Sequence, residues 1–188
     1  VGMTQYTLEE MEAIVDESHT HGRKVAAHAH GNEGIKRAIL AGVDSIEHAS
    51  FLDREAIQMG IDRGTYFAPD IYNTEYTLEM GAANGVPEEN IEKERQVGTV
   101  QRQSFTLAVQ MGAKVVFATD SGVYPHGDNG KQFSRAVRFG MTPAQALQSA
   151  TSLTAELLGW EDQVGTIESG LFADIIAVHG NPLDDISE

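Results

Sequence analysis

The sequence predicts an α/β protein with a parallel β-sheet, and three observations support this fold class. Short apolar segments begin near residues 24, 44 and 65, about 20 residues apart. A helical pattern of apolar residues separates each segment from the next, and a glycine follows each helical pattern. Because neighbouring parallel strands need a crossover connection, this alternation indicates repeated βαβ units.

The first three repeats have well-marked boundaries. Thr7 and Glu10 form a capping box at the start of the first helix, and Asp53 can cap the third. The expected elements are helices at 7–21, 33–40 and 53–63 and strands at 24–28, 44–48 and 65–68.

The second part of the chain begins with an interruption of this repeat. Residues 70–87 contain glycines, asparagines and a proline, which predicts an excursion over the surface. A long helix is expected from 88 to 111, followed at 114–120 by the most strongly apolar strand. Thr142 and Gln145 then form a second capping box and predict another helix.

The last segment differs in pattern from the rest. Beyond Trp160, glycine-rich turns flank apolar runs near 166–167 and 173–178, which predict short strands outside the main repeat. We therefore expect one unit at 1–160 and an appendage at 161–188. Only four core strands are found in 188 residues, whereas a complete (β/α)8 barrel takes about 250 residues. The chain is thus expected to be part of a larger fold.

Composition narrows the classes of function. The chain has 13 Lys+Arg against 28 Asp+Glu and a net charge of −15, which argues against a nucleic-acid partner. It has no cysteine, so disulfides, thiolate zinc sites and cysteine nucleophiles are excluded. No apolar stretch reaches the roughly 20 residues of a membrane span, and no targeting pattern opens the sequence. We therefore expect no membrane partner and, by default, a cytoplasmic protein.

Three predicted strands end in a side chain that can bind a metal: His28, His48 and Asp120. The carboxyl ends of parallel strands form the ligand-binding face of α/β folds. Neutral imidazole suits zinc, and a carboxylate at the same rim can bind the metal or transfer the protons of a bound water. A single histidine at a strand end is often incidental, but three such residues in successive units predict a metal site.

Other polar residues lie near the same rim. His30 follows His28 by two positions and is a second metal ligand, a substrate contact or a solvated loop residue. His126 lies in the loop after the strand at 114–120, where it is either a substrate contact or an ordinary loop residue. Tyr72 and Asn73 follow the third strand and are candidates for a substrate pocket. The remaining histidines are expected to be structural or exposed: His19, His21 and His179.

Several motifs together resemble the amidohydrolase superfamily. Val-Ala-Ala-His-Ala-His-Gly at 25–31, Gly-Val-Asp-Ser-Ile-Glu-His-Ala-Ser at 42–50 and Phe-Ala-Thr-Asp-Ser-Gly at 117–122 resemble its fifth, sixth and eighth barrel strands. The loop Tyr-Pro-His-Gly-Asp-Asn at 124–129 and the tail at 165–178 resemble the imidazolonepropionase-related branch. That branch includes Xaa-Pro dipeptidases of the prolidase type and arginine/lysine carboxypeptidases. The resemblance covers nearly the whole chain.

The resemblance implies a fold and a site. The fold is a (β/α)8 barrel with a small β-sandwich, of which this chain corresponds to strands 5–8 and a C-terminal β segment. His28 and His48 correspond to zinc ligands, and Asp120 to a ligand that is also the general acid/base for a zinc-activated hydroxide. The family holds two zinc ions, but its His-x-His pair on the first strand and its carboxylated lysine on the fourth lie outside the matched motifs. One zinc ion or none is therefore expected here.

The expected function is metal-dependent hydrolysis of a C–N bond in a small molecule, either a dipeptide or a related amide. Two alternatives remain: a folded fragment without catalytic activity, and a deaminase-type hydrolase on the same barrel. The inner faces of the strands are expected to carry apolar side chains, namely Val25, Ile46, Phe67, Val116 and Ala118. Exposure of such a surface favours association, so we expect a homo-oligomer or pairing with a missing N-terminal half.

Overall fold

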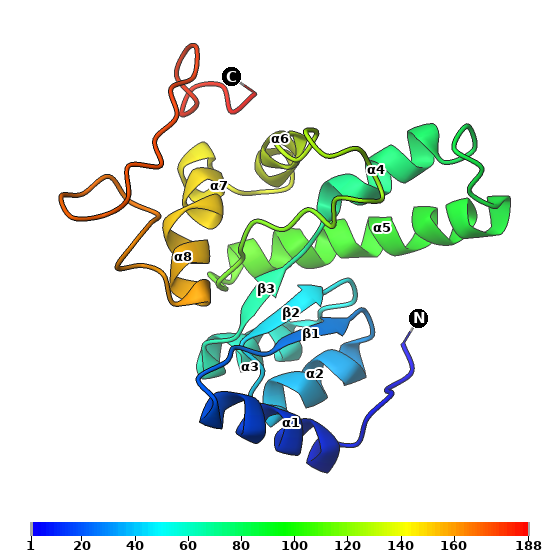
Figure 1. Ribbon diagram of the computed structural model, residues 1–188. Helices are drawn as coiled ribbons and strands as arrows, with labels where there is room; N and C mark the ends of the chain where they lie inside the picture. Colours follow the sequence, from blue (N-terminus) through cyan, green and yellow to red (C-terminus); the bar gives the residue numbers. More distant parts are fainter. Residues whose placement is uncertain (1, 188) are drawn as a thin grey trace.

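Three parallel strands in the order β1-β2-β3 form the sheet of the computed structural model, which describes residues 2–187 (Figure 1). The strands are β1 (Ala26–Ala29), β2 (Ser45–His48) and β3 (Tyr66–Ala68). Ala27 lies opposite Ile46, which lies opposite Phe67. The predicted parallel sheet and its first three strands are confirmed. Each strand is one residue shorter than predicted and begins one or two residues later.

Helices α1 (Leu8–Thr20), α2 (Asn32–Ala41) and α3 (Arg54–Arg63) alternate with these strands and lie on one side of the sheet (Figure 1). The capping box of Thr7 and Glu10 is present, and the Asp53 side chain accepts a hydrogen bond from the backbone N–H of Ala56. The glycines after α2 and α3 adopt left-handed conformations, as predicted for helix ends.

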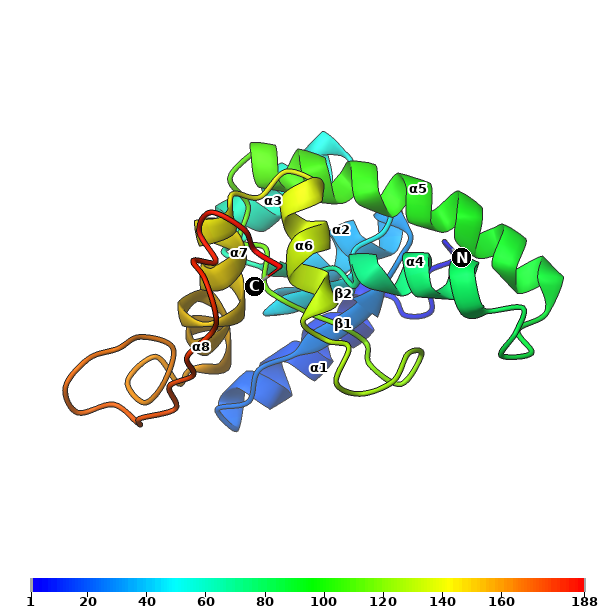
Figure 2. The ribbon, with the colours of Figure 1, turned by 90° about the horizontal axis from the view of Figure 1, so that it is seen from above.

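Helices α4 (Ile71–Met80) and α5 (Glu88–Gln110) form an antiparallel pair that lies side by side in both views (Figures 1 and 2). The long helix was predicted, but the surface excursion at 70–87 is wrong over most of its length. Ile71 and Thr74 are almost fully buried, and α4 packs against α5 and α6. This burial stabilises α4, whose sequence has few local helix markers.

The segment at 114–120, predicted as the strongest strand, makes only one bridge to the sheet, between Phe67 and Val115. The N–H of Phe67 donates to Lys114 O at 2.8 Å, and the N–H of Val116 donates to Phe67 O at 2.9 Å. The next bond of this ladder would run from the N–H of residue 69 to Val116 O, but residue 69 is a proline and has no N–H. The fourth strand is therefore parallel to β3, as expected, but its ladder ends after a single pair. On its other side, the N–H of Phe117 donates to Ser149 O at 3.0 Å.

Three short helices follow: α6 (Lys131–Arg138), α7 (Pro143–Ala150) and α8 (Ser152–Leu158). The capping box of Thr142 and Gln145 opens α7 as predicted, whereas α6 and α8 were not predicted. Within the described residues, no helix is both long and apolar enough to cross a bilayer.

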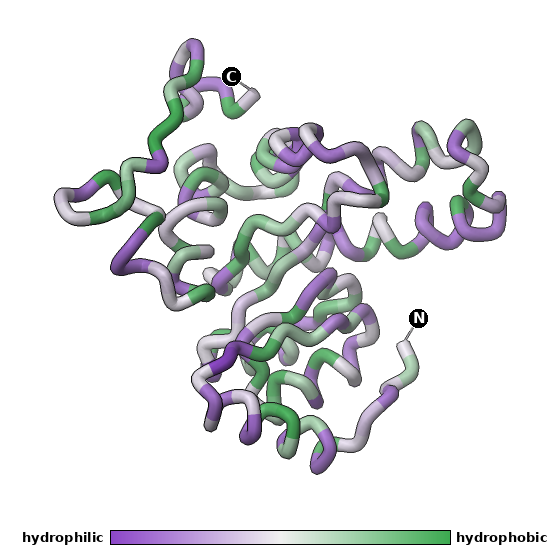
Figure 3. Tube along the Cα trace, viewed as in Figure 1, coloured by the Kyte–Doolittle hydropathy of each residue, from purple (hydrophilic) through white to green (hydrophobic). Residues whose placement is uncertain are grey.

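The tail after Trp160 forms no strand among its described residues, so the strands expected near 166–167 and 173–178 are wrong there. It extends away from α8 as a series of turns (Figure 1), and Figure 3 shows hydrophobic stretches along it. Ile167 and Ile176 are 82% and 86% exposed, because no other described segment covers them. The assignment of 161–188 to a separate β-rich unit stays a prediction, and residue 188 lies outside the described residues.

The two faces of the sheet differ in what covers them. Ile46 and Phe67 are fully buried in the cluster that includes side chains of α2 and α3, and Val25 packs against it. Val116 and Ala118 belong to the opposite face with Leu153 and Leu157 of α8. The expected set of inner-face residues therefore combined both faces, because side chains alternate along a strand and the set did not follow a single alternation across the strands. On β1, Ala27 and Ala29 pack against the helix-side cluster, which directs His28 to the other face.

Candidate metal centre

Three imidazoles meet at the carboxyl end of the sheet. His28 lies on β1, His30 follows that strand directly, and His48 ends β2. The ring centroids of His28 and His48 are 4.4 Å apart, those of His28 and His30 4.8 Å, and those of His30 and His48 4.6 Å. The predicted convergence of His28 and His48 is confirmed, and His30 joins them.

Unusual backbone conformations mark the ends of two segments that carry the site. His48, Ala49 and Asp120 have φ angles of 66°, 49° and 48°, in the left-handed region that residues other than glycine rarely adopt. Such conformations cost on the order of 1–3 kcal/mol and are concentrated at functional sites. Two of the three residues are predicted metal ligands, so the strain lies where the chain turns these side chains toward the rim.

Asp70 is a member of the site that sequence reasoning missed. It follows β3 by two residues, is 6% exposed, and its Oδ1 lies 3.1 Å from His48 Nδ1. Burial by itself raises the pKa of Asp70, but hydrogen bonds from His48, Asn73 and Gln101 outweigh it and lower the pKa to about 2. A signal was present: Pro69-Asp70 places a carboxylate after the third strand, as Asp120 follows the fourth segment.

Asn73 connects Asp70 to Asp120. Its side-chain amide donates to Asp70 Oδ2 at 2.9 Å and to Asp120 Oδ2 at 3.2 Å. Asp120 itself is exposed. Asn73, expected at a substrate pocket, lies between the two carboxylates.

The histidines have different electrostatic surroundings. Burial and the neighbouring imidazoles of His48 and His28 lower the pKa of His30 to about 4, which favours its neutral form. The His30 ring is oriented by Ser50, whose Oγ lies 2.8 Å from Nδ1 and which is fully buried. The pKa of His48 is raised above its ordinary value, chiefly by its hydrogen bond to Asp70.

The donor atoms fall into two groups that share His48. Within each group the candidate ligand atoms lie within 4.8 Å of one another. The groups are His28, His30 and His48, and His48, Asp70 and Asp120. Imidazole nitrogens and carboxylate oxygens are the ligands that zinc takes in catalytic sites, so the donor set fits a zinc ion.

The other predicted site residues lie outside these groups. His126 is exposed in the loop before α6. Tyr72 is only 5% exposed, stacks edge-on against Tyr124 at 4.8 Å between centroids, and has the Arg135 guanidinium 4.9 Å from its ring. Roles of His126 and Tyr72 in substrate binding stay predictions.

The remaining histidines form ion pairs or are exposed, as expected. His19 pairs with Asp44 at 2.8 Å and His21 with Glu17 at 3.0 Å, while His179 is exposed in the tail.

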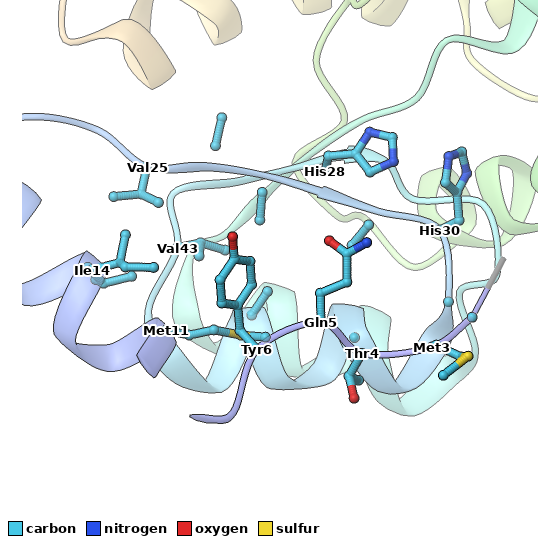
Figure 4. Close-up of a pocket in the computed structure, with 18 residues that line it drawn as sticks. Met3, Thr4, Gln5, Tyr6, Met11, Ile14, Val25, His28, His30 and Val43 are labelled. Atoms are coloured by element: carbon cyan, nitrogen blue, oxygen red, sulfur yellow. The ribbon is translucent and has the colours of Figure 1, made fainter. Parts of the chain in front are cut away.

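A groove of about 790 Å³ runs along the outer edge of β1 and reaches the histidines (Figure 4). The segment at 2–6, helix α1 and β1 form its walls. Figure 4 shows His28 and His30 at one end and Ile14, Met11 and Val25 at the other. The groove thus connects an apolar region beneath β1 to the metal-capable end of the sheet.

Comparison with known proteins gives consistent matches over the whole chain. The sequence model of a family described as "Amidohydrolase family" matches residues 2–188. Ochratoxinase of Aspergillus niger is 32% identical over 187 residues, covering 97% of this chain and 38% of that protein.

Solved structures give the same result. A Xaa-Pro dipeptidase with bound methionine in its active site is 47% identical, with a TM-score of 0.93 over 99% of this chain and 46% of that one. A prolidase complexed with N-methylphosphonate-L-proline is 31% identical, with a TM-score of 0.90 over 97% of this chain and 45% of that one. The chain therefore spans less than half the length of the relatives it matches.

Proposed function

Because the chain belongs to the amidohydrolase family, we propose that the protein containing it is a metal-dependent hydrolase of amide C–N bonds. One observation carries this proposal: His28, His48 and Asp120, which end separate strand segments, meet at one rim of the sheet with Asp70 between the last two. The backbone at His48 and Asp120 is strained, which costs stability and is typical of functional sites.

We assign His28 and His48 as metal ligands and Asp120 as a ligand that also transfers protons. A zinc ion bound by these residues would lower the pKa of a bound water to about 7 and would polarise a carbonyl group. Asp120 accepts the proton of the attacking water and donates it to the amide nitrogen as the C–N bond breaks. Asn73 occupies Oδ2 of Asp120, so Oδ1 is the oxygen that we assign to this proton transfer.

The proposed substrate is a dipeptide, of the Xaa-Pro type or with a C-terminal arginine or lysine. The Xaa-Pro choice rests on the dipeptidase and prolidase structures, the former 47% identical to this chain. The proposed substrate contacts are His30, His126 and Tyr72. His30 has the strongest support, because its ring lies beside both histidine ligands and at the end of the groove.

The activity is expected to require parts of the protein beyond this chain. The chain supplies His28, His48 and Asp120, whereas relatives that it matches are more than twice as long. A site with few donors binds metal weakly, so we expect the 188-residue chain alone to hydrolyse dipeptides far more slowly than the intact protein.

The test is hydrolysis of Xaa-Pro and Xaa-Arg dipeptides by the intact protein before and after treatment with a chelator. We expect the chelator to abolish activity and zinc to restore it. Asp120→Asn should lower kcat by about 10²- to 10⁴-fold, the usual contribution of a general acid/base. The matched control is Asp62→Asn, a carboxylate on the exposed side of α3, which should leave kcat unchanged. Full activity of Asp120→Asn, or activity that resists the chelator, would contradict the proposal.

A further inference from the structure

We propose that Asp70 and Gln101 are positioning residues that fix the orientation and tautomer of His48, so that its Nε2 is presented to the metal. This inference rests on the proposed metal site. It assigns a role to two buried polar residues that do not line the groove.

The first step concerns which nitrogen of His48 carries a proton. An aspartate carboxylate is ionised at the pH of about 9 used in the experiment below and is then an acceptor only. Asp70 Oδ1 lies 3.1 Å from His48 Nδ1, so Nδ1 is the donor in this pair. The neutral ring therefore keeps its free lone pair on Nε2. Carboxylates that fix metal-binding histidines in this way strengthen metal binding in other proteins.

The second step concerns what holds Asp70. Gln101 projects from α5, is 4% exposed, and donates from Nε2 to Asp70 Oδ1 at 2.8 Å. The same Nε2 lies 3.2 Å from the backbone O of His48. The two hydrogens of one amide group thus hold both the carboxylate partner of His48 and the backbone of His48 itself.

The hydrogen bond from Gln101 to the backbone carbonyl of His48 acts on a strained part of the chain. His48 has a φ angle of 66°, where a non-glycine backbone is strained. A fixed donor on that carbonyl stabilises the turn that directs the His48 ring to the rim. Helix α5, which lies outside the sheet, therefore contributes to the geometry of the metal site.

The third step links this arrangement to Asp120. Asn73 donates to the second oxygen of Asp70 and to Asp120 Oδ2. Both oxygens of Asp70 are thus occupied, which keeps its carboxylate plane from rotating. A displacement of Asp70 is expected to disturb His48 and Asp120 together.

The experiment measures the His48 tautomer and zinc affinity separately in the intact protein. The tautomer is read from the ¹⁵N shifts of the imidazole in the metal-free protein at a pH of about 9, well above the ordinary histidine pKa of about 6.5. The wild type should show the Nδ1–H form. A neutral histidine without a partner favours Nε2–H, so Asp70→Ala should convert His48 to that form.

Zinc affinity is measured by calorimetry on the same samples. Asp70→Ala should raise the Kd for zinc about 10- to 100-fold, the usual loss for such a partner. Because this variant can also lose its fold, Gln101→Leu is the second variant, with an expected increase in Kd between the wild type and Asp70→Ala. Gln103→Leu is the matched control: it lies on the same helix, is exposed, and should leave both readouts unchanged.

The outcomes separate the two proposals. A metal-free wild type with His48 in the Nε2–H form, or Gln101→Leu indistinguishable from Gln103→Leu in both readouts, would overturn the positioning roles. An Asp70→Ala protein that folds and keeps Nδ1–H would do the same. A wild type that shows Nδ1–H but binds no zinc would support the positioning roles and contradict the proposed function.

Discussion

Replacement of Gly98 by alanine provides a stability test in which the sequence and the structure predict opposite signs. In an exposed helix interior, alanine is more favourable than glycine by about 1 kcal/mol. Gly98 lies in α5 where it crosses α4, and a Cβ atom built there overlaps Cγ2 and Oγ1 of Thr74 and lies 2.8 Å from its Cβ. Thr74 is 1% exposed, and its branched side chain has no free space to enter.

The magnitude follows from these opposing contributions. Overpacking of a well-packed contact costs about 1–3 kcal/mol, and an overlap with a neighbouring Cβ places this case at the upper end. After subtraction of the helix-propensity gain, we expect Gly98→Ala to lower the free energy of unfolding by about 1–2 kcal/mol. Gly98 precedes Gln101 by less than one helical turn, so separation of α4 from α5 should also weaken zinc binding.

The assay is urea denaturation of the purified protein, with Gly34→Ala as the matched control. Gly34 is also helical, in α2, but a Cβ there meets only Thr4 Cγ2 at 3.9 Å. We expect Gly34→Ala to be neutral or stabilising by up to about 1 kcal/mol. Thr74→Ala should partly rescue Gly98→Ala, because it removes Cγ2 and Oγ1 but keeps Cβ. If Gly98→Ala is as stable as Gly34→Ala, or if Thr74→Ala gives no rescue, the close crossing of α4 and α5 is wrong.

Three further predictions concern other parts of the chain. Burial raises the pKa of Asp44, but hydrogen bonds from His19, the Val25 N–H and Lys24 more than offset it, so the pKa lies below its ordinary value of 3.8. The ionised Asp44 carboxylate therefore stabilises the fold above pH 3.8, and this stabilisation is lost as the pH falls through the lower folded-state pKa. In urea denaturation, Asp44→Asn should lower the free energy of unfolding at pH 7 and should lower it much less near pH 2. Thr142→Ala should cost about 1 kcal/mol, because it removes the side chain that caps α7, and an equal unfolding midpoint would refute this. The 188-residue chain alone should associate at micromolar concentration, and light scattering that shows a monomer without exposed-surface dye binding would contradict this.

Those elements that the sequence predicted well are the ones with local determinants. Both capping boxes, the Asp53 cap and the glycines after α2 and α3 act within one helical turn of their own positions. Strand ends were placed closely enough that His28 and His48 were assigned to one rim, because parallel strands bring their carboxyl ends together regardless of exact length.

The predictions that were wrong concern elements whose formation depends on residues distant in sequence. Helix α4 is stabilised by burial of Ile71 and Thr74 against other helices, which no local pattern shows. The strand at 114–120 has the strongest local pattern, yet it makes a single bridge to β3, where Pro69 lacks the N–H that would continue the ladder. The apolar runs of the tail have the composition of strands but lack a neighbour among the described residues, and a strand forms only where another strand accepts its backbone hydrogen bonds.

The same division explains which part of the site could be predicted. Its metal-capable side chains stand at strand ends, where a simple rule about parallel sheets places them. The side chains that orient these predicted ligands do not follow such a rule. Gln101 is 31 positions from Asp70 in sequence and lies in the middle of a long helix, where its sequence context is that of any other polar residue. Its burial distinguishes it from Gln103 two residues later. Gly98, less than one helical turn before Gln101, lets α5 approach Thr74 of α4 closely. We therefore expect a change in the close helix crossing at Gly98 to be measurable at His48.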